Sequence, residues 1–248
     1  MSGGAGIEFA SARGPDDVRI YAIGDVHGRF DCLSEMHELI AREIERDQPA
    51  DWRIIHLGDY VDRGPHSAEV LNFLAKRCGE DSRIIALAGN HDQGFLDFLA
   101  DPADSELFIH YGGFDTAASY GVVLETHSRE TLAASHRRML AAIPTPHLTF
   151  LRDLERSCSF GDFFFCHAGV RPGVALDAQS EHDLIWIRGE FLRHEGLFEK
   201  VIVHGHTPCS RPEVLANRVN VDTKAFDTGR LTALVVDGSE KRLLSADC

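Results

Sequence analysis

Five short polar motifs constrain the fold of this sequence more than any other feature. They are GDVHG at 24–28, GDYVDRG at 58–64, GNHD at 89–92, HAG at 167–169 and GHT at 205–207. Each motif follows a short apolar run of the kind that forms a buried strand. Because open α/β sheets place their ligand sites at the carboxyl ends of strands, the motifs predict an α/β fold with one polar site.

The first half of the chain alternates predicted strands with predicted helices. Strands are expected at 18–23, 52–57 and 83–88, and helices at 30–47, at 67–78 and from about residue 93. In the first helix the apolar residues Leu33, Met36, Ile40 and Ile44 recur at helical spacing. This β-α-β-α-β order predicts a mainly parallel sheet with right-handed crossovers.

The second half of the chain predicts a helical insert followed by further strands. The insert spans about residues 96–156, a hairpin is expected at 156–160 and 162–166, and strands at 200–203, 218–221 and 231–236. Residues 1–17 are rich in Gly, Ala and Ser and predict a flexible N-terminal leader. We therefore expect a single domain over residues 18–248.

Charge and hydropathy argue against several function classes. A net charge of -14 disfavours general nucleic-acid binding and membrane-surface binding. No apolar run approaches the ~18–20 residues that cross a bilayer, and the N-terminus lacks the basic start and apolar core of a signal peptide. The six cysteines include no close pair such as C-x-x-C, so we expect reduced thiols and a cytoplasmic location.

The motifs supply the ligand types that two divalent metal ions require. The predicted ligands are Asp25, His27, Asp59, Asn90, His167 and His206. The first three would hold one ion and the last three the other, with Asp59 bridging two ions ~3.5–4 Å apart. Carboxylate oxygens combined with imidazole nitrogens suit Mn²⁺, Fe or Zn²⁺. A hydroxide shared by the two ions would then be the nucleophile of a hydrolase.

Other residues of the same motifs suit the remaining catalytic roles. The planar guanidinium of Arg63 can hold two oxygens of a phosphate group. His91 is adjacent to a predicted ligand and suits a general acid that protonates the leaving oxygen. Asp62 can hydrogen-bond the far nitrogen of His91 and orient its ring.

The motifs resemble the phosphoprotein phosphatase (PPP) branch of the calcineurin-like metallophosphoesterases, and within it the bacterial and phage-lambda-like serine/threonine protein phosphatases. The resemblance covers about residues 18–238, and both the DRG at 62–64 and the single histidine of GHT favour this branch. It implies a β-sandwich flanked by helices and a dinuclear centre. We expect Mn²⁺, with Fe, Zn²⁺, Ni²⁺ and Mg²⁺ as alternatives. It also implies a second phosphate-binding arginine, for which Arg188 in IWIR at 185–188 is the candidate.

Two positions depart from that family. Asp92 stands where protein phosphatases usually have Glu, and the symmetrical dinucleoside tetraphosphatases of the same superfamily also have Asp there. Lys224 stands in VDTKA, at 221–225, where the family commonly has Gly. If this loop borders the cleft, the Lys224 ammonium adds positive charge to the substrate rim.

The resemblance implies a phosphomonoesterase that acts on phosphoserine or phosphothreonine in proteins, in one step and without a phosphoenzyme. The alternative is a symmetrical dinucleoside tetraphosphatase or a related nucleotide or RNA-end pyrophosphohydrolase. Asp92 favours this alternative, whereas Asp62 and Pro208 oppose it. A phosphomonoesterase of broad specificity is a further alternative. An inactive scaffold protein of the same fold would have lost ligands, and none is missing in this sequence.

Overall fold

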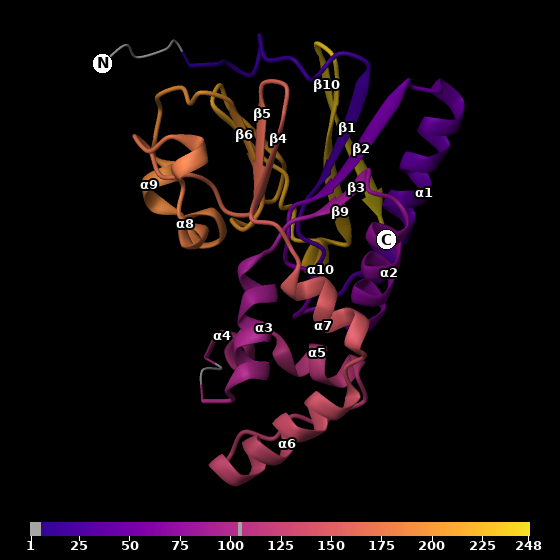
Figure 1. Cartoon of the computed structure of the whole chain (residues 1–248), viewed down its shortest axis with the longest axis vertical. Helices are drawn as coiled ribbons and strands as arrows, with labels where there is room; N and C mark the ends of the chain where they lie inside the picture. The colour runs from indigo at the N-terminus through magenta and orange to yellow at the C-terminus, as the bar shows by residue number, and fades with distance from the viewer. Residues whose placement is uncertain (1–5, 104–105) are drawn as a thin grey trace.

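The structure is a computed structural model that describes residues 6–103 and 106–248. Its strands form two sheets of five strands each (Figure 1). In spatial order, the first sheet contains β10 (Glu240–Asp247), β9 (Arg230–Asp237), β1 (Val18–Ile23), β2 (Asp51–His56) and β3 (Ile84–Ala86). The second contains β4 (Ser157–Phe160), β5 (Phe163–Cys166), β6 (Val201–His204), β8 (Arg218–Asn220) and β7 (Glu213–Val214).

Each sheet contains three adjacent parallel strands. β1, β2 and β3 are parallel, and β9 and β10 add antiparallel strands on the other side of β1. In the second sheet β5, β6 and β8 are parallel, with β4 and β7 antiparallel at the edges. The carboxyl ends of β1, β2, β3, β5 and β6 therefore carry all five motifs.

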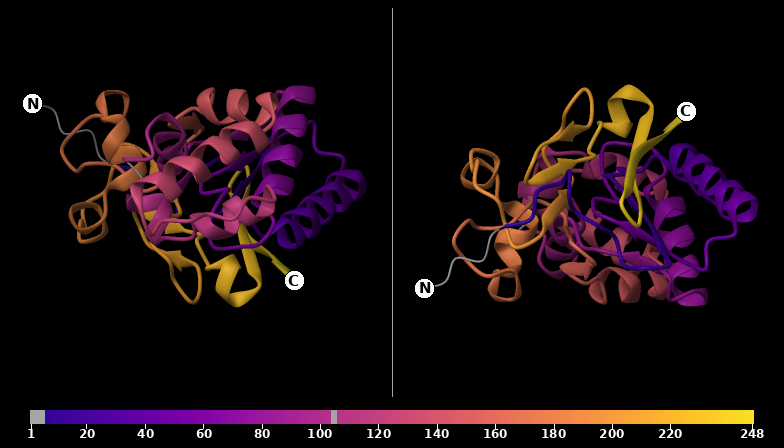
Figure 2. Two further views of the ribbon diagram at one scale, coloured as in Figure 1. Left: turned by 90° about the horizontal axis from the view of Figure 1, so that it is seen from below. Right: turned by 90° about the horizontal axis from the view of Figure 1, so that it is seen from above.

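In the central strands, alternating residues are buried on the two faces of the sheet. In β1, Ile20 and Ala22 join the core between the sheets, whereas Tyr21 and Ile23 face α1 (Phe30–Asp47) on the outside. The second sheet is covered on its outer face by α8 (Glu181–Trp186) and α9 (Gly189–Leu192). Figure 2 shows α1 and the α8–α9 segment on opposite flanks. The predicted β-sandwich flanked by helices is thereby confirmed.

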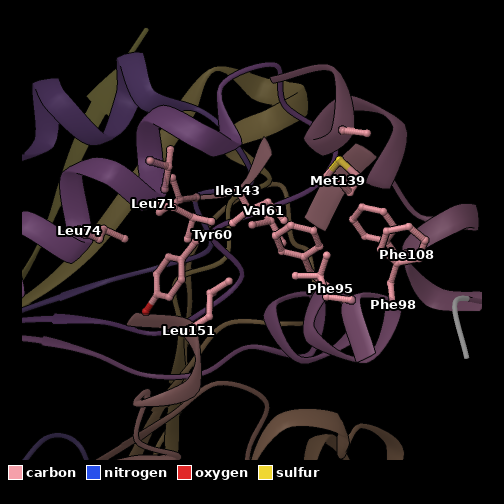
Figure 3. Close-up of a cluster of buried hydrophobic side chains, with 14 of the residues drawn as sticks. Tyr60, Val61, Leu71, Leu74, Phe95, Phe98, Phe108, Met139, Ile143 and Leu151 are labelled. Carbon is pink, nitrogen blue, oxygen red and sulfur yellow. The ribbon is translucent and has the colours of Figure 1, made fainter. Parts of the chain in front are cut away.

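A separate apolar core lies beneath the sandwich, among helices of the insert. Figure 1 shows α3 (Asn90–Ala100), α4 (Glu106–His110), α5 (Gly113–Ser119), α6 (Arg129–Ala142) and α7 (Thr145–Arg152) gathered there, with α2 (Ser67–Glu80) beside them. Phe95, Phe98 and Phe108 stack at the centre of this core and are fully buried (Figure 3). The helices form as predicted because their apolar faces bury one another.

The segment before β1 packs across the sandwich from Ile7 onward. The Ile7 N–H donates to the Phe198 carbonyl at 2.9 Å, and the Phe9 N–H donates to the Ala216 carbonyl at 2.7 Å. Residues 1–5 of the predicted leader lie outside the described residues. The division into a leader and one domain stays a prediction.

Several short elements differ from the sequence-based expectation. α3 begins at Asn90 rather than near residue 93, because the Asp92 side chain caps its first turn. β10 was not predicted because its residues are mostly exposed and lack a clear apolar alternation. A 3₁₀-helix (Leu176–Ala178) and the one-turn helix α10 (Ala225–Thr228) are too short to have a periodic signal. No helix in the described part of the chain is long and apolar enough to span a membrane.

The expectation that all cysteines are reduced is corrected for one pair. Cys32 in α1 and Cys248 form a disulfide, with Cα atoms 5.3 Å apart and a sequence separation of 216 positions. A bridge over this separation has no spacing signature in the sequence, because the fold alone brings the two residues together. Among the described residues the remaining cysteines, Cys78, Cys158, Cys166 and Cys209, are free.

Candidate metal centre

All six predicted ligands lie together at the strand ends between the two sheets. Asp25 and His27 follow β1, and Asp59 follows β2. Asn90 opens α3 directly after β3, while His167 and His206 follow β5 and β6. Each of these side chains is at most 4% exposed. The site is therefore built from five separate chain segments and is enclosed by protein.

The Asp59 carboxylate lies at the centre of the site. Its Oδ2 is 3.4 Å from the Nε2 of His27, and its Oδ1 is 3.4 Å from the Nε2 of His167. Asp59 thus belongs to two groups of donor atoms, one with His27 and His91 and one with His167 and His206. One oxygen faces each group, which is the arrangement that a carboxylate bridging two ions requires.

Backbone carbonyls fix which ring nitrogen is available for a metal. The Nδ1 of His27 lies 2.8 Å from the Val61 carbonyl oxygen, and the Nδ1 of His167 lies 2.9 Å from the Leu57 carbonyl oxygen. A carbonyl oxygen can only accept, so each Nδ1 carries the proton and donates it. The Nε2 lone pairs therefore point into the site, toward Asp59.

Asn90 links the two histidines on the opposite side of Asp59. Its Oδ1 is 2.9 Å from the Nε2 of His167 and 2.8 Å from the Nδ1 of His206. Burial lowers the pKa of His167 and lowers that of His206 to about 2, so both imidazoles are neutral at physiological pH. Neutral imidazoles and an amide oxygen are suitable ligands for a divalent cation of the Mn²⁺ or Zn²⁺ type.

A further carboxylate, Asp222, belongs to this site although the sequence did not single it out. Burial and the neighbouring carboxylates of Asp222 and Asp59 raise the pKa of Asp25 well above its usual range. Asp222 is itself buried, and its Oδ2 has no hydrogen-bond partner among the described residues. A cation would offset this repulsion between carboxylates, so the donor set fits a dinuclear metal centre.

His91 and Asp62 form a buried pair next to the predicted ligands. The Nδ1 of His91 is 2.7 Å from the Oδ2 of Asp62, and the Thr116 hydroxyl donates to the Oδ1 of Asp62 at 2.8 Å. Burial alone would lower the pKa of His91, but the carboxylates of Asp59 and Asp62 outweigh it, and the pKa is raised. The contact with Asp62 through Nδ1 leaves the Nε2 of His91 facing the site.

The two predicted phosphate-binding arginines both reach the ligand histidines. The Nη1 of Arg63 lies 3.0 Å from the Nε2 of His27, and its Nη2 lies 2.9 Å from the Nε2 of His91. Arg188 donates from Nε to the Nε2 of His206 at 2.9 Å and from Nη2 to the His206 carbonyl at 3.2 Å. Two guanidinium groups therefore border the candidate metal centre.

The backbone is strained where it carries the site residues. Positive φ angles occur at His27 (45°), Asp59 (55°), Asp62 (72°), Arg63 (70°) and His206 (63°). Left-handed conformations at non-glycine residues cost of order 1–3 kcal/mol each and tend to cluster at functional sites. Five of the eight non-glycine residues with positive φ among the described residues therefore belong to the strand-end motifs, and Asp17, Gln48 and Lys224 lie outside them.

Asp92 has a structural place in the site. Its carboxylate accepts hydrogen bonds from the backbone N–H groups of Asp59 at 2.8 Å, Tyr60 at 2.9 Å and Gly89 at 2.9 Å. The side chain is 1% exposed and holds the second motif against the third. Asp92 therefore positions Asp59 and has no surface available to a substrate.

A shared carboxylate between two histidine-containing donor groups, with two arginines beside it, suits the metal-dependent hydrolysis of phosphoesters. The family model of the calcineurin-like phosphoesterases matches residues 18–227, and the chain belongs to this family. Hydrolysis of phosphoesters at a dinuclear divalent metal centre is the chemistry of this family.

Two curated relatives carry different activity names. The bis(5'-nucleosyl)-tetraphosphatase PrpE [asymmetrical] of Halalkalibacterium halodurans is 26% identical over 231 residues, covering 86% of this chain and 87% of that protein. Serine/threonine-protein phosphatase 1 of Salmonella typhimurium is 28% identical over 218 residues, covering 86% of this chain and 89% of that protein. The family is therefore common to both, while the substrate differs between them.

Solved structures support the fold. A protein provisionally named as a diadenosine tetraphosphatase superposes with a TM-score of 0.62 at 19% identity, covering 94% of this chain and 98% of that one. A cold-active protein tyrosine phosphatase superposes with a TM-score of 0.56 at 18% identity, covering 95% and 82% of the two chains. At these identities the likeness concerns the fold alone.

Proposed function

We propose that this protein is a phosphomonoesterase that hydrolyses phosphoserine and phosphothreonine in proteins. The observation that carries the proposal is the buried pair of His91 and Asp62, with 2.7 Å between Nδ1 and Oδ2. A serine or threonine alkoxide is a poor leaving group and needs a proton as the P–O bond breaks. A nucleotide phosphate leaves more easily and depends less on such an acid.

One set of residues in the site would hold the two metal ions. Asp25, His27 and Asp59 would hold one divalent ion, and Asn90, His167, His206 and the shared Asp59 would hold the other. When bound, the two ions supply a hydroxide nucleophile and neutralise charge on the phosphoryl group, and we expect Mn²⁺ in this role.

The protein side chains around that centre bind and orient the substrate. Arg63 and Arg188 would hold the non-bridging phosphate oxygens through their planar donor groups. His91 would deliver its proton from Nε2 to the leaving oxygen, while Asp62 keeps the ring oriented through Nδ1. Attack and departure would occur in line, without a covalent phosphoenzyme.

The alternative substrate class is a dinucleoside polyphosphate. It is favoured by the name of the tetraphosphatase relative, which is 26% identical to this chain. Asp92, which favoured it at the level of sequence, gives it no direct structural support because its carboxylate is occupied by backbone N–H groups. The alternative therefore rests on similarity alone.

A cytoplasmic location is part of the proposal. The disulfide between Cys32 and Cys248 is the observation that weighs against it, since disulfides are rare in reducing compartments.

The test compares two substrates in one preparation. The kcat/KM of the Mn²⁺-loaded protein is measured on a phosphothreonine peptide and on diadenosine tetraphosphate, with EDTA as the control. We expect the peptide to be preferred and EDTA to abolish both activities. A preference for the dinucleotide would overturn the protein-phosphatase proposal and leave the metal site intact.

A further inference from the structure

An aromatic residue outside the five motifs contacts two of the site's functional side chains. Phe226 lies in α10, and the Cζ of Arg63 is 4.8 Å from the centroid of its ring. The imidazole of His27 meets the same ring edge-on, with centroids 5.4 Å apart and an interplanar angle of 88°. We propose that Phe226 is a positioning residue that holds the Arg63 guanidinium, and with it the phosphate-binding geometry, in place.

The contact with Arg63 has the geometry of a cation–π interaction. A guanidinium within about 6 Å of an aromatic centroid is attracted by the negative face of the ring, and more strongly where water is excluded. Here the guanidinium is also held by His27 and His91 through its two terminal nitrogens. The ring of Phe226 therefore adds a contact at the Cζ of the guanidinium group, whereas the two histidines contact its terminal nitrogens.

The position of Phe226 is itself fixed by the fold. Arg29, which directly follows the first motif, donates from Nη1 to the Ala225 carbonyl at 2.7 Å. Ala225 is 1% exposed, and the residue before it, Lys224, starts the helix with a φ of 57°. The turn that carries Phe226 is thus attached through Arg29 to the segment that carries His27.

This inference rests on the proposed role of Arg63 in binding phosphate. An arginine that must be ordered by its ligand loses side-chain entropy on binding, whereas one already held in place loses less. Replacing the ring by an aliphatic side chain of similar bulk would keep the packing but remove the attractive face. Phosphate affinity would then fall while the metal ligands remain intact.

The experiment measures binding of inorganic phosphate to the Mn²⁺-loaded protein by isothermal titration calorimetry. We expect Phe226→Leu to weaken phosphate binding by about 5- to 20-fold and Phe226→Tyr, which restores the ring, to bind as the wild type does. The matched control is Phe160→Leu, because Phe160 also faces a guanidinium, with the Cζ of Arg53 at 5.9 Å, but is not part of the site. Mn²⁺ stoichiometry is measured first for every variant.

A double-mutant cycle separates positioning from general packing. In an Arg63→Met background, Phe226→Leu should cause no further loss of phosphate affinity, because there is no guanidinium left to position. An equal loss in both backgrounds, or wild-type affinity in Phe226→Leu, would overturn the inference. A wild-type protein that binds Mn²⁺ but no phosphate would instead overturn the proposed role of Arg63, and the inference would fall with it.

Discussion

At the scale of single residues, His91 shows how the surroundings of a side chain prepare it for catalysis. A histidine side chain ordinarily has a pKa near 6.5, so it loses its proton as the pH rises above that value. The carboxylates of Asp59 and Asp62 overcome the effect of burial and raise the pKa of His91. A raised pKa preserves the protonated form to higher pH, which is the direction that a general acid requires.

We predict that His91→Asn lowers kcat by about 10²–10⁴-fold on a phosphoserine peptide and much less on p-nitrophenyl phosphate. The nitrophenolate leaves without a proton, so it does not need the acid. In the wild type, kcat on the peptide should fall as pH rises through the raised pKa of His91, and this basic limb should be absent in the variant. Equal losses on both substrates would show that His91 has another role.

Asp92 shows which information about a side chain a comparison of sequences does not contain. Asp92 suggested a nucleotide substrate by comparison with other sequences, yet its carboxylate is fully used by three backbone N–H groups. Motif comparison identifies which residue type is present but not what its side chain contacts. Asp222 and Phe226 were missed for the related reason that a single acidic or aromatic residue has no spacing pattern.

At the scale of elements, the close approach of strand ends depends on glycine. A Cβ atom on Gly205 would lie 1.9 Å from the Oδ1 of Asp25, so the turn after β6 can meet the turn after β1 only without a side chain. The His206 N–H, one residue later, donates to the Oδ2 of Asp25 at 3.1 Å. The glycine thus allows two segments of different sheets to share one site.

We predict that Gly205→Ala displaces Asp25 and weakens Mn²⁺ binding by at least about tenfold, in line with the effect of disturbing groups around a metal site. The measurement is Mn²⁺ titration calorimetry on the metal-free protein. Gly79→Ala is the control, because a Cβ there meets no atom within 4 Å. It should bind Mn²⁺ normally and be about 0.5–1 kcal/mol more stable. Normal Mn²⁺ affinity in Gly205→Ala would contradict the argument.

Strongly patterned elements could be predicted from the sequence, and weakly patterned ones could not. The strand at 18–23 and the helix at 30–47 match β1 and α1 at both ends, since each has a clear period and a defined stop. β10 lies at a sheet edge with most of its residues exposed, so its pairing with β9 comes from tertiary context. The clustering of the six candidate ligands could be predicted because each of them follows a recognisable strand.

At the scale of the whole molecule, Cys248 is covalently linked to α1, the helix that follows the first motif. Cys248 is bonded to Cys32 of α1, and the Cys248 carbonyl accepts from the Nη2 of Arg29 at 3.2 Å. A link between residues 216 positions apart restricts the unfolded chain strongly. The bridge therefore stabilises the side of the sandwich on which α10 and Phe226 lie.

We predict four titratable thiols in the denatured protein without reductant and six after reduction, since six cysteines include one bonded pair. Cys248→Ser should lower the free energy of unfolding by about 2–5 kcal/mol under oxidising conditions. Thiol titration and chemical denaturation provide the two measurements. Six thiols without reductant would show that the pair is reduced in the isolated protein.

The site as described requires one carboxylate, that of Asp59, to serve two metal ions. This requirement is tested most directly by Mn²⁺ titration calorimetry, with metal content of the dialysed protein as a second measurement. We predict two ions per chain for the wild type and one for His27→Ala, because the group around His167 and His206 stays intact. Asp59→Asn should lose high-affinity binding at both sites together. Two ions retained in Asp59→Asn, or a single ion in the wild type, would contradict this account.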